Sequence, residues 1–272
     1  MIQRHPPTDE IRSRLGFAAG NTMPCAKLAL KWFGKDTFEP DHKSDGTPVT
    51  IADQTIETEL RKRIAESFPD DAILGEEFPD KPGTNDYQWV IDPIDGTISF
   101  VQGVPLFGTM LACLYKGVPI IGAIAMPCLD EIVYAGSGLG AFHQTKDHKP
   151  VTARVSEVEQ LDQALVNTTA LTYFTTPEQR SLYDHIDDQC KHTRGFPDCY
   201  GIVLLATGRV DAVIEPNVAL WDIASVPTLI TEAGGVSTDL AGNDTVHTGS
   251  LLAATPGVHA QMLRLIKDSE ID

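Results

Sequence analysis

One segment constrains the fold of this chain more than any other, the sequence WVIDPIDGTISF at residues 89–100. Its three leading apolar residues predict a buried strand, and they run directly into Asp92 and Asp95. Carboxylates at the end of a core strand lose hydration energy unless a cation or a hydrogen-bond donor compensates them. The segment therefore predicts a strand that ends in an acidic site, where the partner is a metal ion, a substrate, or a nearby Arg or Lys.

The spacing of the two aspartates suits a hard divalent cation. Asp92 and Asp95 are three residues apart around a turn that Pro93 restrains, so both carboxylates can face one point. The carbonyl oxygen of Ile94 can point the same way, and Mg²⁺ prefers oxygen ligands of this kind. The alternative is an acidic turn that only caps the following helix.

Gly96 and Thr97 are expected to begin that helix. The free N–H groups of its first turn can bind a phosphate, which the helix dipole also favours. Metal ligands beside a phosphate site are typical of metal-assisted phosphoryl transfer to water. The spacing D-x-x-D-G-T differs by one residue from the D-x-D-x-T of enzymes that form an aspartyl-phosphate, so we expect an activated water and no covalent nucleophile.

Composition narrows the possible partners. The 272 residues include 38 acidic and 21 basic ones, which gives a formal net charge of −17. Because no Lys/Arg cluster interrupts this acidity, we expect no binding to nucleic acid. Anionic small molecules stay possible substrates, since bound divalent cations reverse the local field.

The same sequence predicts a cytoplasmic location. Its five cysteines are odd in number and form no CxxC pair. The N-terminal residues lack the apolar segment of a secretory signal, and no run of about 18 apolar residues predicts a membrane span. These features indicate reduced cysteines packed in the core.

The hydrophobic pattern predicts a layered α+β fold. Residues 107–127 predict a hairpin that turns at Lys116 and Gly117, and further short strands follow it. After residue 150, helices alternate with short strands. The other expected elements are helices at 9–33 (with a kink near Gly20 and Pro24), 50–68, 177–190, 198–207, 221–235 and 256–268, and strands at 72–78, 88–92, 131–136, 140–143, 164–169, 210–216 and 250–255. Antiparallel strands mixed with helices argue against a regular parallel βαβ fold. A soft boundary divides the chain into halves, 1–148 and 149–272.

Three segments together carry a family resemblance. GEEF (75–78), WVIDPIDGTISF (89–100) and WDIASVPTLITEAGG (221–235) resemble the signature segments of the inositol monophosphatase family, in the same order and spacing. The likeness runs over roughly residues 10 to 265. It implies an alternating αβαβα layered sandwich, usually a homodimer, that hydrolyses phosphate monoesters with two or three Mg²⁺ ions per active site, for which Mn²⁺ can substitute.

The resemblance also implies a set of metal ligands. Glu76, Asp92 and the Ile94 carbonyl would hold a first ion, and Asp92, Asp95 and Asp222 a second one. Glu76, with waters, would help to hold a third ion, which makes it a catalytic residue as well. Pro227 departs from a regular helix in the third segment and predicts a kink or a later helix start after Asp222.

Further residues follow from the same resemblance. Asp53 and Thr97 would form the pair that orients or activates the attacking water, and the amides of Gly96 and Thr97 would bind the phosphate. Lys43 matches a loop lysine near the metals, although a solvated loop lysine is an equal alternative. Glu77 is expected to be a solvated neighbour of the metal ligand before it.

Specificity is expected in the second half, where the sequence most resembles the histidinol-phosphatase branch of the family. Inositol phosphatases carry small residues near positions 196–198, whereas this chain has Phe196, Pro197 and Asp198. Asp198 and Glu215 would pair with the ammonium and imidazole of histidinol phosphate. The alternatives are that Asp198 caps the helix 198–207 and that Glu215 is a surface acid.

The leading hypothesis is therefore a Mg²⁺-dependent histidinol-phosphate phosphatase of histidine biosynthesis. The alternative within the family is an inositol-1-monophosphatase or a broader sugar-phosphate phosphatase. A third hypothesis, a regulatory binding protein without activity, is disfavoured because all the implied metal ligands are present.

Overall fold

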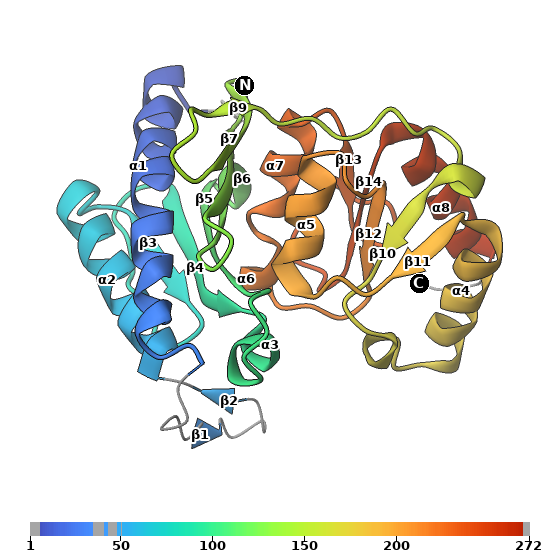
Figure 1. Cartoon of the computed structure of the whole chain (residues 1–272). Coiled ribbons are helices and arrows are strands. Elements are labelled where there is room, and N and C mark those ends of the chain that lie inside the picture. The colour runs from blue at the N-terminus through green and yellow to red at the C-terminus, as the bar shows by residue number, and fades with distance from the viewer. Residues whose placement is uncertain (1–5, 35–40, 43–47, 50, 269–272) are drawn as a thin grey trace.

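The structure is a computed structural model that describes residues 6–34, 41–42, 48–49 and 51–268. Five layers alternate between helices and sheets, with two sheets separated by a central helical layer (Figure 1). This arrangement confirms the predicted α+β fold and its αβαβα order. Lys43 lies outside the described residues, which between residues 35 and 50 comprise only a short pair of strands, β1 (Asp41–His42) and β2 (Pro48–Val49).

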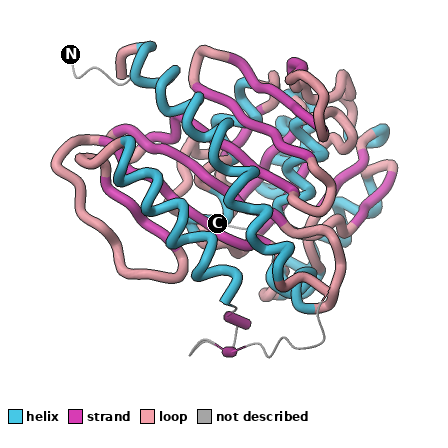
Figure 2. Tube along the Cα trace, turned by 60° about the vertical axis from the view of Figure 1, so that its left-hand side comes forward, coloured by secondary structure: helices cyan, strands magenta, loops and turns pink. Residues whose placement is uncertain are grey.

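The first layer consists of α1 (Thr8–Ala26) and α2 (Ile51–Ser67), which lie across one face of the larger sheet (Figures 1 and 2). A 3₁₀ turn at Lys27–Lys31 follows α1, so the predicted helix at 9–33 ends early, after accommodating Pro24 inside it. Ile56, Leu60 and Ile64 on α2 are fully buried, as their i, i+4, i+8 spacing predicts.

The larger sheet has seven strands in sequential order. They are β3 (Ala72–Gly75), β4 (Tyr87–Asp95), β5 (Gly108–Tyr115), β6 (Val118–Met126), β7 (Glu131–Gly136), β8 (Gly140–Thr145) and β9 (Val151–Thr152). All neighbours are antiparallel except β3 and β4. The strand predicted at 72–78 stops at Gly75, and the one predicted at 88–92 continues to Asp95, so both boundaries of the acidic segments were wrong.

The central layer consists of α5 (Asp198–Ala206), α6 (Leu220–Ile223) and α7 (Val226–Glu232). The apolar α5 is buried on nearly all sides, which fits a helix between two sheets. The segment predicted as a helix at 221–235 forms two helices that meet at Ser225, which confirms the kink or later helix start predicted from Pro227. Pro227 lies in the first turn of α7, where backbone N–H groups have no intrahelical acceptor, so a proline there costs no helical hydrogen bond. At this junction, a Cβ on Gly122 of β6 would lie 2.1 Å from the Ser225 carbonyl oxygen, so the close approach requires glycine.

The second sheet has five strands in the order β11-β10-β12-β14-β13. They are β10 (Leu165–Asn167), β11 (His192–Arg194), β12 (Ala212–Glu215), β13 (Val236–Thr238) and β14 (Leu251–Ala254). The outer helices α4 (Pro177–Gln189) and α8 (Pro256–Asp268) form the last layer, and 3₁₀ turns lie at Leu161–Gln163 and Leu171–Tyr173. Within the described ranges, no helix is both long and apolar enough to cross a bilayer.

Candidate active site

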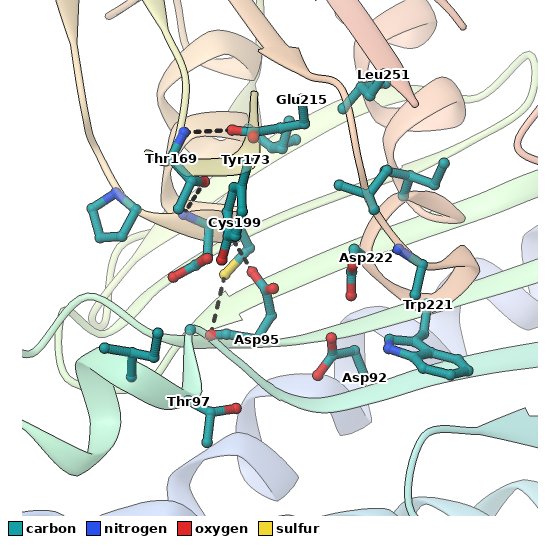
Figure 3. A pocket seen from close by; sticks show the side chains of 18 of the residues that line it. Asp92, Asp95, Thr97, Thr169, Tyr173, Cys199, Glu215, Trp221, Asp222 and Leu251 are labelled. Carbon is teal, nitrogen blue, oxygen red and sulfur yellow. Dashed lines mark hydrogen bonds between the residues drawn. The ribbon is translucent and has the colours of Figure 1, made fainter. Parts of the chain in front are cut away.

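A cavity of about 710 Å³ lies where the end of β4 meets the central helical layer. Its lining includes six carboxylate side chains, which come from both halves of the chain (Figure 3). They are Glu76, Asp92, Asp95, Asp198, Glu215 and Asp222. Among the described residues that line it, none is Lys, Arg or His. The described lining therefore repels an anion unless cations are bound with it.

The end of β4 is irregular, and this irregularity lets both of its aspartates, Asp92 and Asp95, face the cavity. The pairing with β5 shifts register between Asp92 and Asp95. The hydroxyl of Thr109 on β5 donates to the Pro93 carbonyl oxygen at 2.7 Å, which fixes the turn from the side of the sheet. Gly96 then adopts φ +88° and precedes α3 (Thr97–Val101), as the sequence predicts.

Three of the predicted metal ligands converge. Carboxylate oxygens of Asp92, Asp95 and Asp222 all lie within 4.8 Å of one another. Asp222 is held by α6, where its Oδ2 accepts the N–H of Ala219 at 2.8 Å. Asp95 accepts the N–H of Cys199 at the start of α5. One acidic centre is thus built from the first sheet and from the central helices.

The electrostatics of this centre fit a divalent cation. Burial, and then the charges of Glu76, Asp95 and other acids, raise the pKa of Asp92 well above its ordinary value. Burial and the charges of Asp198 and Asp222 do the same to Asp95. Asp92 Oδ1 is buried and has no hydrogen-bond partner among the described residues. A cation would supply that missing partner and relieve the repulsion between the acids.

The other sequence-predicted residues on this side lie close to the centre. Glu76 lines the cavity just beyond the end of β3. Asp53, in the first turn of α2, is 2% exposed and contributes to the raised pKa of Asp92, although it is not among the residues that line the cavity. The Thr97 hydroxyl donates to the Ile94 carbonyl oxygen at 3.1 Å. Glu77 does not line the cavity.

Glu215 lies on the opposite wall, at the end of β12. Its Oε1 accepts the N–H of Thr169 at 2.6 Å, and its Oε2 lies 3.4 Å from the Thr168 hydroxyl. Burial raises its pKa to about 8, against the hydrogen bonds from Thr169, which lower it. Because its side chain is buried and faces the cavity, the alternative of a surface acid is wrong.

Asp198 lies beside Glu215 in an unusual conformation. Its φ is +51°, in the left-handed region, and its N–H donates to the Thr169 hydroxyl at 2.9 Å. Burial and the charge of Asp222 raise its pKa to about 6. The alternative that Asp198 caps α5 is wrong, because Pro197 occupies the N-cap position and no side chain caps the helix.

Sequence reasoning missed Thr169, Tyr173 and Asn217, which also line this wall. Thr169 contacts both acids, through its N–H and its hydroxyl. Burial and the charge of Asp198 raise the pKa of Tyr173 to about 12, so it stays a neutral donor. Thr169 and Tyr173 follow β10, in a loop and a 3₁₀ turn, and Asn217 follows β12. No local sequence pattern marks any of the three.

We expect Glu215→Gln to stabilise the protein at alkaline pH. With a folded-state pKa of about 8 against an ordinary 4.5, Glu215 costs stability progressively as pH rises from about 4.5 through about 8. Glutamine avoids this ionisation. At about 1.36 kcal/mol per pKa unit, the difference between the two pKa values sets an upper bound of about 5 kcal/mol; because glutamine also loses part of the hydrogen bonding to Thr168 and Thr169, the gain should be roughly 1–3 kcal/mol at alkaline pH and should vanish in acid.

The measurement is urea unfolding with a chelator present, over a series of pH values. The exposed Glu157→Gln is a matched control. A difference between Glu215→Gln and wild type that does not change with pH would contradict the raised pKa.

Comparisons with known proteins agree on one family. The profile of the inositol monophosphatase family matches residues 12–270. A histidinol-phosphatase of Chlorobaculum parvum is 36% identical over 90% of this chain and 93% of its own length. One from Mycobacterium tuberculosis is 36% identical over 85% and 89%. The solved structure of a Thermotoga maritima IMPase, 27% identical, superposes with a TM-score of 0.82 over 94% of this chain and 97% of its own. The chain therefore belongs to the inositol monophosphatase family and is a phosphoric monoester hydrolase.

Proposed function

We propose that this protein is a Mg²⁺-dependent histidinol-phosphate phosphatase. The observation that carries the metal dependence is a cavity with six carboxylates and, among its described lining residues, no basic side chain. A phosphate ester carries about two negative charges at neutral pH, so bound cations must neutralise the site. The proposed ligands are Glu76, Asp92, the Ile94 carbonyl oxygen, Asp95 and Asp222, for two or three Mg²⁺ ions, with Mn²⁺ as a substitute.

The bound ions would polarise the phosphate and lower the pKa of a water molecule. The side chains of this chain orient that water. Thr97 donates its hydroxyl proton to the Ile94 carbonyl, so its Oγ1 lone pairs are left to accept a hydrogen bond from the water. In the proposal, the buried Asp53 acts together with Thr97 to orient and activate that water. The amides of Gly96 and Thr97 hold the phosphate, and Lys43 is proposed to approach it from its loop.

The specificity for histidinol phosphate rests on the second wall of the cavity. Glu215 is buried and Asp198 half-buried, and their pKa values are raised to about 8 and about 6, as expected for acids in the absence of a cation. A leaving group with an ammonium and an imidazole would supply the missing positive charge. The two relatives named histidinol-phosphatase support this choice of substrate.

A panel of phosphate esters tests the proposal. We expect the wild-type protein to prefer histidinol phosphate to inositol phosphate by kcat/KM. Asp198→Asn preserves the shape and removes the charge, so it should lower kcat/KM for histidinol phosphate by roughly 10–100-fold, the value of one charged hydrogen bond. The rate with inositol phosphate should change little.

Equal losses on both esters would contradict an ammonium contact at Asp198. The second candidate is an inositol-1-monophosphatase or a sugar-phosphate phosphatase, which the likeness to the Thermotoga maritima IMPase favours. A wild-type preference for inositol phosphate would establish it.

The proposal also includes the assembly and its surroundings. We expect a homodimer in the cytoplasm, with the half 1–148 supplying most metal ligands and the half 149–272 supplying specificity. The larger sheet ends at Thr152 and the second sheet begins at Leu165, which supports a boundary near residue 150. Light scattering measures the dimer.

A further inference from the structure

Glu57 carries a buried charge that none of the steps above uses. It lies on α2, one turn after Asp53, and its side chain is 0% exposed. Its Oε1 accepts Nε of Arg61 at 2.7 Å, and its Oε2 accepts the backbone N–H of Glu77 at 2.8 Å. Removing a carboxylate from water is costly, and here both oxygens are matched by specific donors. One of those donors belongs to the residue directly after the proposed ligand Glu76.

Arg61 extends the same contact along the chain. Its guanidinium donates to the carbonyl oxygen of Phe78 at 3.0 Å and to that of Pro79 at 3.1 Å. Three consecutive residues, 77 to 79, are therefore bonded to α2. Since β3 ends at Gly75, the backbone of Glu76 is fixed by the sheet on one side and by Glu57 and Arg61 on the other.

The contact with Gly75 is equally close. A Cβ built on Gly75 would lie 2.1 Å from Glu57 Oε1 and 2.4 Å from its carboxyl carbon. The Glu57 carboxylate thus packs against the Cα atom of the residue directly before Glu76. Only glycine allows this approach, so the carboxylate holds the chain on both sides of the metal ligand.

Asp53 shares a face of α2 with Glu57, because the two are four residues apart. The helix therefore carries both the acid proposed to act with Thr97 on the attacking water and the group that holds Glu76. We propose that Glu57 is a positioning residue: together with Arg61 it fixes Glu76 relative to Asp53 and Asp92, so that Glu76 can ligate a divalent cation. This role rests on the proposed metal-dependent function.

The test measures metal uptake without turnover. In Glu57→Gln, an NH₂ group replaces one of the two accepting oxygens, so either Arg61 or the Glu77 N–H loses its acceptor at nearly constant volume. We expect the Kd for Mn²⁺, measured by calorimetry without substrate, to rise about 10–100-fold, as is typical when a partner of a metal ligand is lost. Arg61→Lys keeps the charge and loses the donors to residues 78 and 79, so it should weaken Mn²⁺ binding in the same direction and by less.

Glu131→Gln is the matched control. Glu131 is also a buried carboxylate, 5% exposed, which accepts from Arg209 and from the His143 ring, and it does not line the cavity. Its substitution should lower the unfolding midpoint and leave the Mn²⁺ affinity unchanged. A positioning role for Glu57 requires this difference between the two variants.

Two results would overturn the inference alone. One is a wild-type Mn²⁺ affinity in folded Glu57→Gln and Arg61→Lys. The other is a loss of Mn²⁺ affinity in Glu131→Gln that equals the loss in Glu57→Gln. If Glu57→Gln does not fold, Arg61→Lys decides by itself. A wild-type protein that takes up no Mn²⁺ is a separate result, which overturns the proposed function and the positioning role with it.

Discussion

Asp92→Asn is expected to lower kcat/KM for phosphate esters on the order of 10³-fold. The proposed metal ions would contribute several kcal/mol of charge stabilisation in the transition state, and each 1.36 kcal/mol corresponds to a factor of ten in rate. Asp92 is the most central ligand in the proposal, and its Oδ1 is buried without a hydrogen-bond partner among the described residues. Calorimetry should show a matching loss of Mg²⁺ and Mn²⁺ uptake.

The same substitution should stabilise the metal-free protein. Because the pKa of Asp92 is raised in the fold, wild-type stability falls as pH rises through that pKa, and asparagine removes this loss. Thermal unfolding with a chelator at pH 8 measures the gain. Asp147→Asn, an exposed change in a turn, is the control and should alter neither property. An Asp92→Asn protein that keeps its metal affinity would refute the role of Asp92 as a ligand.

Asp71→Ala is expected to destabilise the fold by about 3–5 kcal/mol, because it leaves a buried guanidinium without its main partner. Asp71 is 1% exposed and Arg14 is 3% exposed, with Nη2 of Arg14 at 2.9 Å from Asp71 Oδ1. The carboxylate also accepts Nε1 of Trp89 at 2.9 Å and Nδ2 of Asn85 at 2.7 Å. Urea unfolding measures the loss.

The surface pair between Asp9 and Arg12 is a suitable control. Both side chains are largely exposed, at 94% and 65%, so Asp9→Ala should cost less than about 1 kcal/mol. A loss for Asp71→Ala as small as that of the control would show that Glu10, the other partner of Arg14, compensates for Asp71.

The acidic centre of Asp92, Asp95 and Asp222 could be predicted because each of its two segments carries a recognisable local pattern. Asp92 and Asp95 are contained in one six-residue segment, and Asp222 follows an aromatic residue in a second. The layered fold followed from strands and helices with clear periodicity. The boundaries at Gly75 and Asp95 were missed because a bulge and a side-chain contact, which have no periodic signal, decide where those strands end.

Beyond Asp198 and Glu215, the second wall could not be predicted in the same way. Thr169 is placed by the parallel pairing of β10 with its neighbours, which no local pattern reveals. Strand β11 has only three residues and alternates exposed and half-buried positions, too short a pattern to recognise. Glu57 and Arg61 have the i, i+4 spacing of an ordinary surface ion pair, and only the packing of α2 against residues 75–79 distinguishes them.

The left-handed backbone at Asp198 limits which substitutions at this position could change the substrate preference during evolution. Among the amino acids, glycine, asparagine and aspartate tolerate that conformation best. An aspartate codon becomes either of the other two by one nucleotide change. The accessible mutational routes at this position therefore all remove the negative charge while sparing the backbone, and lineages that abandon an amine-bearing ester should pass through glycine or asparagine there.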